Sequence, residues 1–493
     1  MLTLAIFAPL AGAMVLFLIP ERRPMLIRGV ALGISLVPIV FQVATSTEFD
    51  ATGGFELVES AAWIPTLGVA YIVGVDGISL PLAAMTALVF VASIAYPVDL
   101  RGRPREYYAL FLFLECASLG VFLALDLFLF YVFWDVSLVG MYFLIGGWGH
   151  GDSARRAGLK FFLYTLAGSL AMLLAILGLY LSMEPNTFDM AAIIDAQPLG
   201  ATGILPVLVF TGFALAFVVK APLVPFHTWL PPAHVEAPAP ASAILAGVLL
   251  KMGTYGFVRI LLQMLPEAFQ RFALPLAVLA LVSILYGALV SLAQGHMKRR
   301  IAYTSVNHMG YTVLGVAAAA AALSGVERAR ALALTGAVVE MVAHGLITGA
   351  LFLVSGSVWR RAETYEIEDF GGLAGRAPFL MFLTAIAAFA SLGLPGLAGF
   401  VAEFQIFVGT FGVFPWIAGL GLLGILITAA LFLQMLQRMF LGARPQRWDQ
   451  WEPLSRTEAW ALSTLLAFVV LIGVAPSWLL EVIHATSTAI VGP

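Results

Sequence analysis

Residues 213–231 read FALAFVVKAPLVPFHTWLP, an uncharged run that leads into Lys220 and is followed by three prolines. A lysine inside an apolar segment costs free energy, and prolines beside it interrupt the helix that would satisfy the backbone. An interrupted helix at membrane depth is tolerated where it lines a cavity. The combination therefore indicates a functional amine beside a helix that is broken at Pro222 and Pro225.

The composition places this stretch in a membrane. Of the 493 residues, 61% are hydrophobic and only 11% are charged, which leaves too little polar surface for a soluble protein. Apolar runs recur along the chain, each long enough to cross about 30 Å of hydrocarbon. The first run lacks a basic n-region and a cleavage site, so we interpret it as a retained span rather than a signal peptide. We predict an all-α integral membrane protein.

Polar and Pro/Gly breaks between the apolar runs predict about fourteen transmembrane helices. The predicted spans lie near residues 1–20, 27–45, 76–98, 107–125, 128–148, 158–182, 202–227, 240–263, 272–294, 300–323, 329–357, 378–411, 413–438 and 458–483. The longest connection, at 46–75, carries four acidic residues and no basic residue.

The basic residues predict the orientation. With the N-terminus outside, nineteen of the 25 Arg and Lys residues lie in cytoplasmic connections, four, including Arg259, lie outside, and Lys220 and Lys251 lie within the membrane. The positive-inside rule favours this arrangement, which puts both termini on the periplasmic side of a bacterial inner membrane. Arginine stays protonated, whereas a buried lysine can release its proton. Lysines at membrane depth therefore point to proton chemistry.

Six titratable side chains are predicted at similar depth in six spans: Asp135, Lys220, Lys251, His308, His344 and Glu403. A purely structural interpretation is a buried ion pair or a histidine that ties two helices together. Because ionisable groups are expensive in a bilayer and usually mark ion pathways, we predict that this set transfers protons. We hypothesise that movement of Asp135 towards or away from Lys220 switches the lysine between holding and releasing a proton.

The combination of a proline break and an ionisable residue occurs twice. The second instance, LPGLAGFVAEF, places Glu403 after Pro395, five spans beyond Lys220. An odd offset reverses the direction through the membrane, so spans 4–8 and 9–13 are predicted to form an inverted repeat. The predicted domains are residues 1–106 with spans 1–3, residues 107–263 and 272–438 as the two five-helix repeats, and residues 439–493 as a cytoplasmic connection with the last span.

Two further carboxylates are secondary candidates. Glu340 precedes His344 by four residues, so it either steadies the imidazole or faces a neighbouring subunit. Glu115 lies in the middle of its span and either joins the network of Asp135 or makes an ordinary hydrogen bond between helices.

A third group of candidates follows the first proline break. His227, His234 and Glu236 have side chains of metal-ligand type. Pro231 and Pro232, and the lack of any pattern of residues that would orient such ligands by hydrogen bonds, argue against a metal site. We predict that these residues line the cytoplasmic water path.

Cofactor motifs are missing from the sequence. The single cysteine, Cys116, excludes disulfides, Fe–S clusters and thiolate metal sites within the chain. No GxxxxGK[ST] loop occurs, and no glycine fingerprint follows a strand. The net charge of −3 gives no argument for nucleic acid. We predict a chain without cofactor, metal or nucleic acid.

Several longer motifs resemble one known family. The runs VKAPLVPFHTWLPPAHVEAP, AGVLLKMGTYGF, GALVSLAQGHMKRRIAYTSVNHMG, FLFYVFWDVSLVGMYFLIGGWG and GVDGISLPL are similar to the antiporter-like subunits of NADH:quinone oxidoreductase, respiratory complex I. The resemblance covers nearly the whole chain. It is strongest to the M type, whose twelfth span carries a glutamate, matched by Glu403, where the L and N types carry lysine.

The resemblance implies a proton channel with half-channels from both sides joined by a central hydrophilic axis. It implies Asp135 and Lys220 as the fifth- and seventh-span pair, the buried Lys251 and histidines as the axis, and Glu403 at the exit or at the boundary with the next subunit. It also implies L-type, N-type and small membrane subunits as partners. NADH, FMN, Fe–S clusters and quinone would reside in partner subunits.

Three positions depart from the family pattern. Asp135 replaces a glutamate, Pro232 stands in LPPAH where the family has an acid, and His296 stands where the QxDxKR loop has an acid. Two other functions share most of the motifs. One is a Mrp-type Na⁺/H⁺ antiporter subunit, against which Glu403 argues mildly, and the other is the membrane arm of a hydrogenase or ferredoxin-driven complex.

Overall fold

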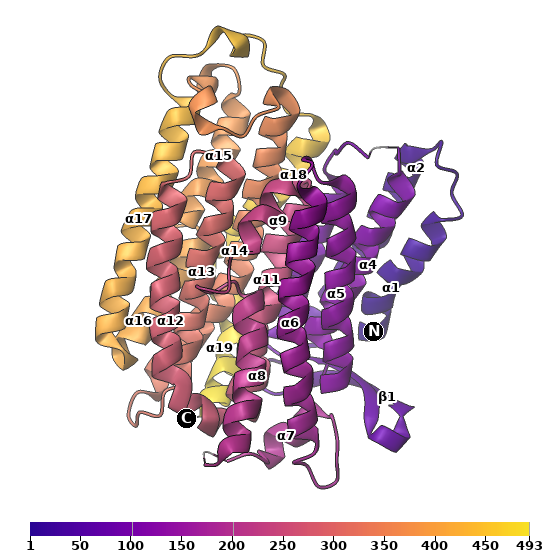
Figure 1. Ribbon diagram of the computed structural model, residues 1–493, viewed down its shortest axis with the longest axis vertical. Coiled ribbons are helices and arrows are strands. Elements are labelled where there is room, and N and C mark those ends of the chain that lie inside the picture. The colour runs from indigo at the N-terminus through magenta and orange to yellow at the C-terminus, as the bar shows by residue number, and fades with distance from the viewer. Residues whose placement is uncertain (101, 201, 493) are drawn as a thin grey trace.

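The fold, seen in a computed structural model that describes residues 1–100, 102–200 and 202–492, is a bundle of helices that stand side by side (Figure 1). The helices are α1 (Leu2–Leu16), α2 (Pro24–Glu48), α3 (Ser79–Ala95), α4 (Pro104–Leu123), α5 (Leu127–Trp148), α6 (Ala154–Tyr180), α7 (Met190–Ala196), α8 (Ile204–Lys220), α9 (Leu230–Glu236), α10 (Ala239–Ile244), α11 (Leu250–Gly256), α12 (Pro266–Leu292), α13 (Met297–Ala319), α14 (Glu327–Ala362), α15 (Pro378–Ser391), α16 (Ala398–Val413), α17 (Pro415–Phe440), α18 (Arg456–Val474) and α19 (Ser477–Val491). Helices α1 and α2 lie at one edge of the bundle and α17 at the other.

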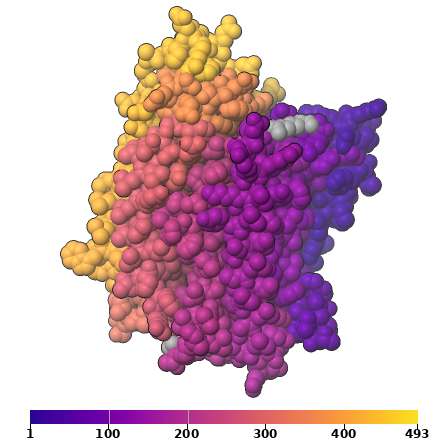
Figure 2. Space-filling model, viewed as in Figure 1, coloured from indigo at the N-terminus to yellow at the C-terminus, as the bar shows by residue number. Residues whose placement is uncertain are grey.

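The lateral surface of the bundle is apolar. Within the described residues, nine helices are long and apolar enough to cross a membrane. Outward-facing side chains such as Val40 (65% exposed), Leu174 (71%) and Leu426 (67%) would be unfavourable in water and are suited to hydrocarbon. Figure 2 shows the same succession of colours across the surface, with the golden connection between α17 and α18 projecting at the upper end. The prediction of an all-α, multi-pass membrane protein is confirmed.

The predicted spans overlap the helices, and the differences lie at proline and glycine positions. The predicted span at 378–411 is divided into α15 and α16, and that at 458–483 into α18 and α19. The span at 240–263 is one continuous helix, Ala239–Leu262, with π-helical turns at Leu245–Leu249 and Phe257–Leu262. Prolines begin α2, α4, α12, α15 and α17, where the missing amide hydrogen costs no helical hydrogen bond.

The long acidic connection predicted at 46–75 contains a β-hairpin. Strand β1 (Glu56–Ile64) pairs antiparallel with β2 (Val69–Val75). Glu59 of β1 accepts hydrogen bonds from the amides of Leu2 (2.8 Å) and Thr3 (3.0 Å) at the start of α1. Burial raises the pKa of Glu59, but its hydrogen bonds outweigh that effect and lower the pKa to about 2. The ionised carboxylate caps the amide end of a helix that has no side-chain cap of its own.

A buried ion pair joins this part of the chain to the end of the Ala239–Leu262 helix. Arg259, which the orientation count places outside the membrane, is only 1% exposed, and its guanidinium lies 2.6 Å from the Asp76 carboxylate. Tyr255 and Gln263 accept further hydrogen bonds from Arg259, each at 2.9 Å. The long polar side chain is buried because every nitrogen finds a partner.

We expect Asp76→Asn to lower the free energy of unfolding by about 3 kcal/mol, because it leaves the Arg259 charge buried without a counter-ion. Asparagine keeps an oxygen that can accept the two hydrogen bonds that the amides of Ile78 and Ser79 now donate to Asp76 Oδ1. The measurement is thermal unfolding of the purified protein in detergent. The control is Glu21→Gln, which removes the partially exposed pair with Arg105 and should cost less than about 1 kcal/mol. Equal losses in the two variants would contradict the expectation.

Candidate functional site

The break after Lys220 is stabilised by hydrogen bonds from neighbouring side chains and amides. Helix α8 ends at Lys220, and the chain turns before α9 begins. The indole Nε1 of Trp229 donates to the carbonyl of Val219 at 2.9 Å, and the amide of Val224 donates to Ser283 Oγ at 3.0 Å. These contacts satisfy backbone groups that the prolines remove from the helix. Specific hydrogen bonds therefore stabilise the break, which ends α8 inside the protein.

Lys220 is 1% exposed and lies against one face of α5. Its Nζ donates to Ser137 Oγ at 3.4 Å and lies 5.0 Å from the centre of the Trp134 ring. Asp135 is half-buried, accepts a hydrogen bond from Ser169 Oγ at 2.5 Å, and forms no ion pair with Lys220 among the residues described. Residues two apart on a helix do not share a face, so contact of the amine with Ser137 leaves Asp135 to one side.

Lys251 is fully buried and contacts a histidine directly. Its Nζ donates to the carbonyl of Ala246 and lies close to His344 Nδ1, each at 2.5 Å. Ala246 belongs to the π-helical turn, which opens the helix five residues before the lysine. A hydrogen bond between Lys251 Nζ and His344 Nδ1 needs one donor and one acceptor, so one of these two nitrogens must be neutral and offer a lone pair. Lys251 and His344 therefore form a pair that can hold one proton between them.

Lys220 and Lys251 lie on helices in direct backbone contact. A Cβ atom at Gly253 would lie 2.7 Å from the amide nitrogen of Ala221, which adjoins Lys220. Only glycine permits this approach of the lysine-bearing helix to the end of α8. Ser137 Oγ, which accepts from Lys220, also lies 3.8 Å from Met252 Sδ, next to Lys251.

His308 joins two carboxylates and a hydroxyl. Its Nδ1 lies 3.1 Å from Glu340 Oε1 and 3.8 Å from Glu403 Oε1, and its Nε2 lies 3.0 Å from Ser391 Oγ. The ring centre of His308 is 5.2 Å from that of His344. The structure thus brings together five of the predicted residues, which run from Lys251 through His344 and His308 to Glu340 and Glu403. We call these five residues the buried axis.

The second proline break places Glu403. Helix α15 ends at Ser391 and α16 begins at Ala398, beyond Pro395. Gly393 has φ +76°, and a Cβ at this position would lie 2.3 Å from Glu403 Oε2. The glycine therefore provides both the left-handed backbone of the break and the space for the carboxylate. A cavity of about 460 Å³ adjoins Glu403 on its outer side, walled by aromatic residues of α16 such as Phe404 and Phe411.

The candidates after the first break divide into two settings. His227 lines a cavity of about 520 Å³ together with Pro232, Glu236 and Arg299. His234 is completely buried and stacks on Phe352, with ring centres 4.4 Å apart. No group of three or more His, Cys, Asp or Glu side chains able to hold a metal ion occurs in the described chain.

Three secondary candidates have defined partners. Glu236 accepts hydrogen bonds from the amide of Gly151 (2.9 Å) and from the Ser153 hydroxyl, so it fixes the start of α6. Glu115 is buried and accepts from Ser35 Oγ at 2.9 Å. This is the hydrogen bond between helices that the sequence left open, and it does not involve Asp135. Glu340 forms a hydrogen bond with His308, and no hydrogen bond with His344 occurs in the described chain.

Sequence reasoning missed Lys298 and three serines. Lys298, counted only among the basic residues of the cytoplasmic connections, is 0% exposed and donates to the carbonyls of Val235 and Ala237. The hydroxyls of Ser137, Ser169 and Ser391 bind the predicted titratable groups. Serines occur in many apolar helices, so no sequence signal distinguished these three.

His296, which stands where the family pattern has an acid, is uncharged at neutral pH. Its side chain caps the start of α13, where Nδ1 accepts from the amide of Arg299 at 3.4 Å. Burial, with the neighbouring Arg299 and Lys298 charges, lowers the pKa of His296 to about 4. A neutral imidazole therefore stands where the family pattern has an acid, and it caps α13 without adding another cation.

A helical membrane bundle with two broken helices and a buried row of lysines, histidines and carboxylates defines a membrane protein of the proton-transporting class. A family model described as "NADH:quinone oxidoreductase/Mrp antiporter, TM" matches residues 124–428. The protein named NAD(P)H-quinone oxidoreductase chain 4 2 of Thermosynechococcus vestitus is 38% identical over 99% of this chain and 91% of its own length. The chain belongs to this family and, within it, to the chain 4, or M-type, antiporter-like subunits.

Two solved structures share the fold. A chain of respiratory complex I from Thermus thermophilus is 31% identical, with a TM-score of 0.88 and full coverage of both chains. A chain of the Mrp complex from Dietzia is 21% identical, with a TM-score of 0.86 over 100% of this chain and 97% of its own. At that identity the second likeness concerns the fold alone.

Proposed function

We propose that this chain is a proton-translocating membrane subunit of an NAD(P)H:quinone oxidoreductase of the complex I type. The observation that carries the proposal is the contact of Lys251 Nζ with His344 Nδ1 at 2.5 Å, followed by His308 between two carboxylates. Proton transfer needs groups within hydrogen-bond reach or separated by one water. The buried axis meets that requirement across α11, α13, α14 and α16.

Lys220 and Asp135 form the first part of the proposed path. In the present arrangement the amine binds Ser137 and the carboxylate binds Ser169, so the two charges are held apart. Movement of the Asp135 side chain towards Lys220 would favour the protonated amine, and its return would favour release of the proton. Backbone contact at Gly253 then brings the helix of Lys251 next to Lys220.

The partner subunits complete the proposed enzyme. Redox chemistry with NADH, FMN, Fe–S clusters and quinone belongs to other subunits, and this chain contributes the membrane path. We propose an L-type and an N-type antiporter-like subunit and small membrane subunits as its neighbours. The cavity beside Glu403 opens among exposed aromatic residues, including Phe404 (56% exposed), and supports an inter-subunit boundary there.

The proposed topology has fourteen spans with both termini periplasmic in a bacterial inner membrane. The excess of Arg and Lys in the connections on one side supports this orientation. Residues 107–263 and 272–438 would form the inverted repeats, each with one broken helix, between residues 1–106 and 439–493. The cavity lined by His227 would then be the cytoplasmic water entry, and Lys298 would lie beside it.

The relatives favour this function over the two alternatives. The similar proteins with chain 4 names are 36–40% identical, whereas the Mrp structure is 21% identical. A chain of the membrane-bound sulfane sulfur reductase, an archaeal respiratory membrane complex, is 24% identical. Glu403 at the second break agrees with the M type.

The test of the function is purification of the native complex that contains this chain. We expect flavin and Fe–S subunits to co-purify, and the complex in liposomes to couple NAD(P)H oxidation by quinone to proton uptake measured with a pH-sensitive dye. A complex of small membrane subunits that exchanges Na⁺ for H⁺ without redox activity would overturn the proposal.

Two buried carboxylates provide a matched pair of variants. We expect Glu403→Gln to lower proton translocation about ten-fold, because the amide cannot exchange a proton with His308. Glu115→Gln should leave translocation within about two-fold, since Gln can still accept the hydrogen bond from Ser35. Both variants are measured as proton uptake by the reconstituted complex. Equal losses would contradict the assignment of Glu403 to the path and Glu115 to helix packing.

A further inference from the structure

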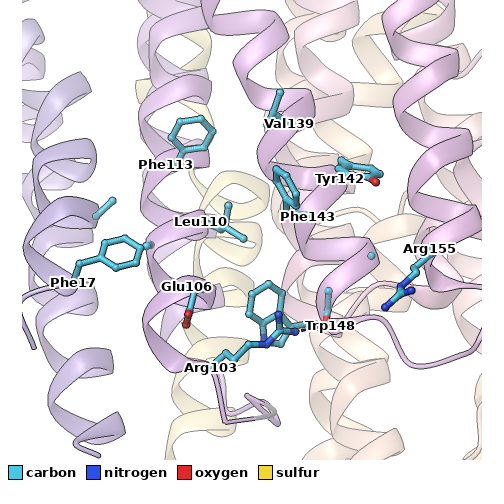
Figure 3. Close-up of a pocket in the computed structure, with 14 residues that line it drawn as sticks. Phe17, Arg103, Glu106, Leu110, Phe113, Val139, Tyr142, Phe143, Trp148 and Arg155 are labelled. Atoms are coloured by element: carbon cyan, nitrogen blue, oxygen red, sulfur yellow. Dashed lines mark hydrogen bonds between the residues drawn. The ribbon is translucent and has the colours of Figure 1, made fainter. Parts of the chain in front are cut away.

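A second site lies far from the buried axis, on the outer face of α1, α4, α5 and α6. It is a cavity of about 710 Å³. Figure 3 shows Arg103, Glu106 and Trp148 near one end of the cavity and the apolar Phe113 and Val139 near the other. Arg103 and Phe113 are ten residues apart on or beside α4, about 15 Å at the helical rise per residue. This length matches the depth of one leaflet of a bilayer.

The polar end of the cavity has unused binding groups. Arg155 is exposed and has no hydrogen-bond or ion-pair partner among the described residues. The Oε2 atom of Glu106 is buried and also has no partner in that part of the chain. Arg103 is held in place, since it donates to the carbonyl of Gly147 at 2.9 Å and its guanidinium lies 4.4 Å from the Trp148 ring centre.

The apolar end faces outward. Phe17 (53% exposed), Val139 (40%) and Phe143 (51%) line the cavity with large apolar side chains. Figure 3 shows Phe17 of α1 across the cavity from Phe143 of α5. A wall of this composition with a charged rim is suited to an amphiphile whose chain lies along the helices.

We propose that this cavity binds phosphatidylethanolamine, with its phosphate at Arg103 and Arg155, its ammonium at Glu106 and an acyl chain against Phe113 and Val139. Two guanidinium groups complement the phosphate, and charge-assisted hydrogen bonds from an ammonium satisfy the unpartnered carboxylate oxygen. Phosphatidylcholine has the same net charge but no N–H donor, so it leaves Glu106 Oε2 unsatisfied. Phosphatidylglycerol offers only neutral hydroxyl donors to that oxygen. The charge-derived orientation places the site in the cytoplasmic leaflet.

The experiment uses the complete membrane complex in liposomes that contain photoactivatable phosphatidylethanolamine, phosphatidylcholine or phosphatidylglycerol with identical diazirine-bearing chains. Labelled peptides from residues 104–123 and 127–148 are quantified by mass spectrometry. We expect about ten-fold more labelling by phosphatidylethanolamine than by either other lipid, the ratio for one charge-assisted hydrogen bond of about 1.4 kcal/mol.

Three variants separate the contributions of the side chains. Glu106→Gln should reduce the ratio of phosphatidylethanolamine to phosphatidylcholine labelling to about two-fold or less, because a neutral amide no longer attracts the ammonium. Arg155→Gln should lower labelling by all three lipids, and it breaks no hydrogen bond or ion pair among the described residues because Arg155 is exposed and forms none there. Arg156→Gln, on the neighbouring exposed residue outside the cavity, should change nothing. Equal labelling by the three lipids, preferred labelling by phosphatidylglycerol, or no labelling because a neighbouring subunit covers the cavity would overturn the proposal.

Discussion

Replacing Lys220 with methionine is expected to lower proton translocation by the complex about a hundred-fold. This is the lower end of the range of about 10²–10⁴-fold for loss of one proton-transfer group. Methionine is unbranched and about as long, so it fills the space beside Trp134 that the lysine side chain, with its Nζ 5.0 Å from the ring centre, now occupies. The change therefore removes the amine and preserves the packing. Proton uptake into liposomes during NAD(P)H oxidation measures the loss. Electron transfer from NAD(P)H to a soluble acceptor that bypasses quinone is measured in parallel. It shows that the redox subunits of the complex are intact.

Lys220→Arg distinguishes a proton carrier from a fixed charge. Arginine retains the positive charge and can still donate to Ser137, but it stays protonated at any working pH. We expect this variant to lose proton translocation nearly as completely as the methionine variant. If Lys220→Arg kept normal translocation, the lysine would act as a fixed charge, and the proposed release of its proton would be wrong.

Replacing His344 with asparagine is expected to lower proton translocation at least about ten-fold, because it interrupts the buried axis at its centre. His344 contacts Lys251 at 2.5 Å, and its ring lies 5.2 Å from that of His308. Asparagine keeps an oxygen that can accept a hydrogen bond from Lys251, so the buried amine is not left without a partner. The amide takes up no proton in the accessible pH range. Lys251 and His308 would then lack a titratable group between them.

His484 is the matched control for this variant. It is also a histidine that contacts α14, since its Nδ1 lies 3.1 Å from Thr335 Oγ1, but it is exposed and contacts no member of the buried axis. His484→Asn should leave proton uptake within about two-fold, because only a partly buried hydrogen bond to Thr335, away from the buried axis, changes. Similar losses in both histidine variants would show that α14 is sensitive to substitution in general. Normal uptake in His344→Asn would show that protons bypass His344.

Much of the fold follows from local sequence patterns. Length and continuity of apolar runs predict where helices cross a bilayer, because each span must satisfy its own backbone. Prolines after Lys220 and before Glu403 likewise predict the two breaks, which occur where expected. The β-hairpin was missed because β1 has no strict alternation, and its pairing depends on a partner strand and on α1.

Less of the site follows from the sequence. The depth of Lys251, His308 and His344 in their spans predicts burial but not which groups touch. Asp135 and Lys220 were expected to act as a pair, yet their side chains bind Ser169 and Ser137, since neighbouring positions on α5 point to different faces. Lys298 also shows the limit of charge counting. It follows a polar loop in the sequence, and only the ending of α9 against α13 buries it.

Local composition is enough to show that this chain spans a membrane, where its helices are interrupted, and which side chains are desolvated, because these properties depend on each segment and its solvent. Which of those side chains meet depends on the three-dimensional packing. The contact of Lys251 with His344, the position of His308 between Glu340 and Glu403, and the burial of Arg259 against Asp76 join residues 32 to 183 positions apart. Such contacts depend on the rotation and packing of whole helices, which no local pattern specifies.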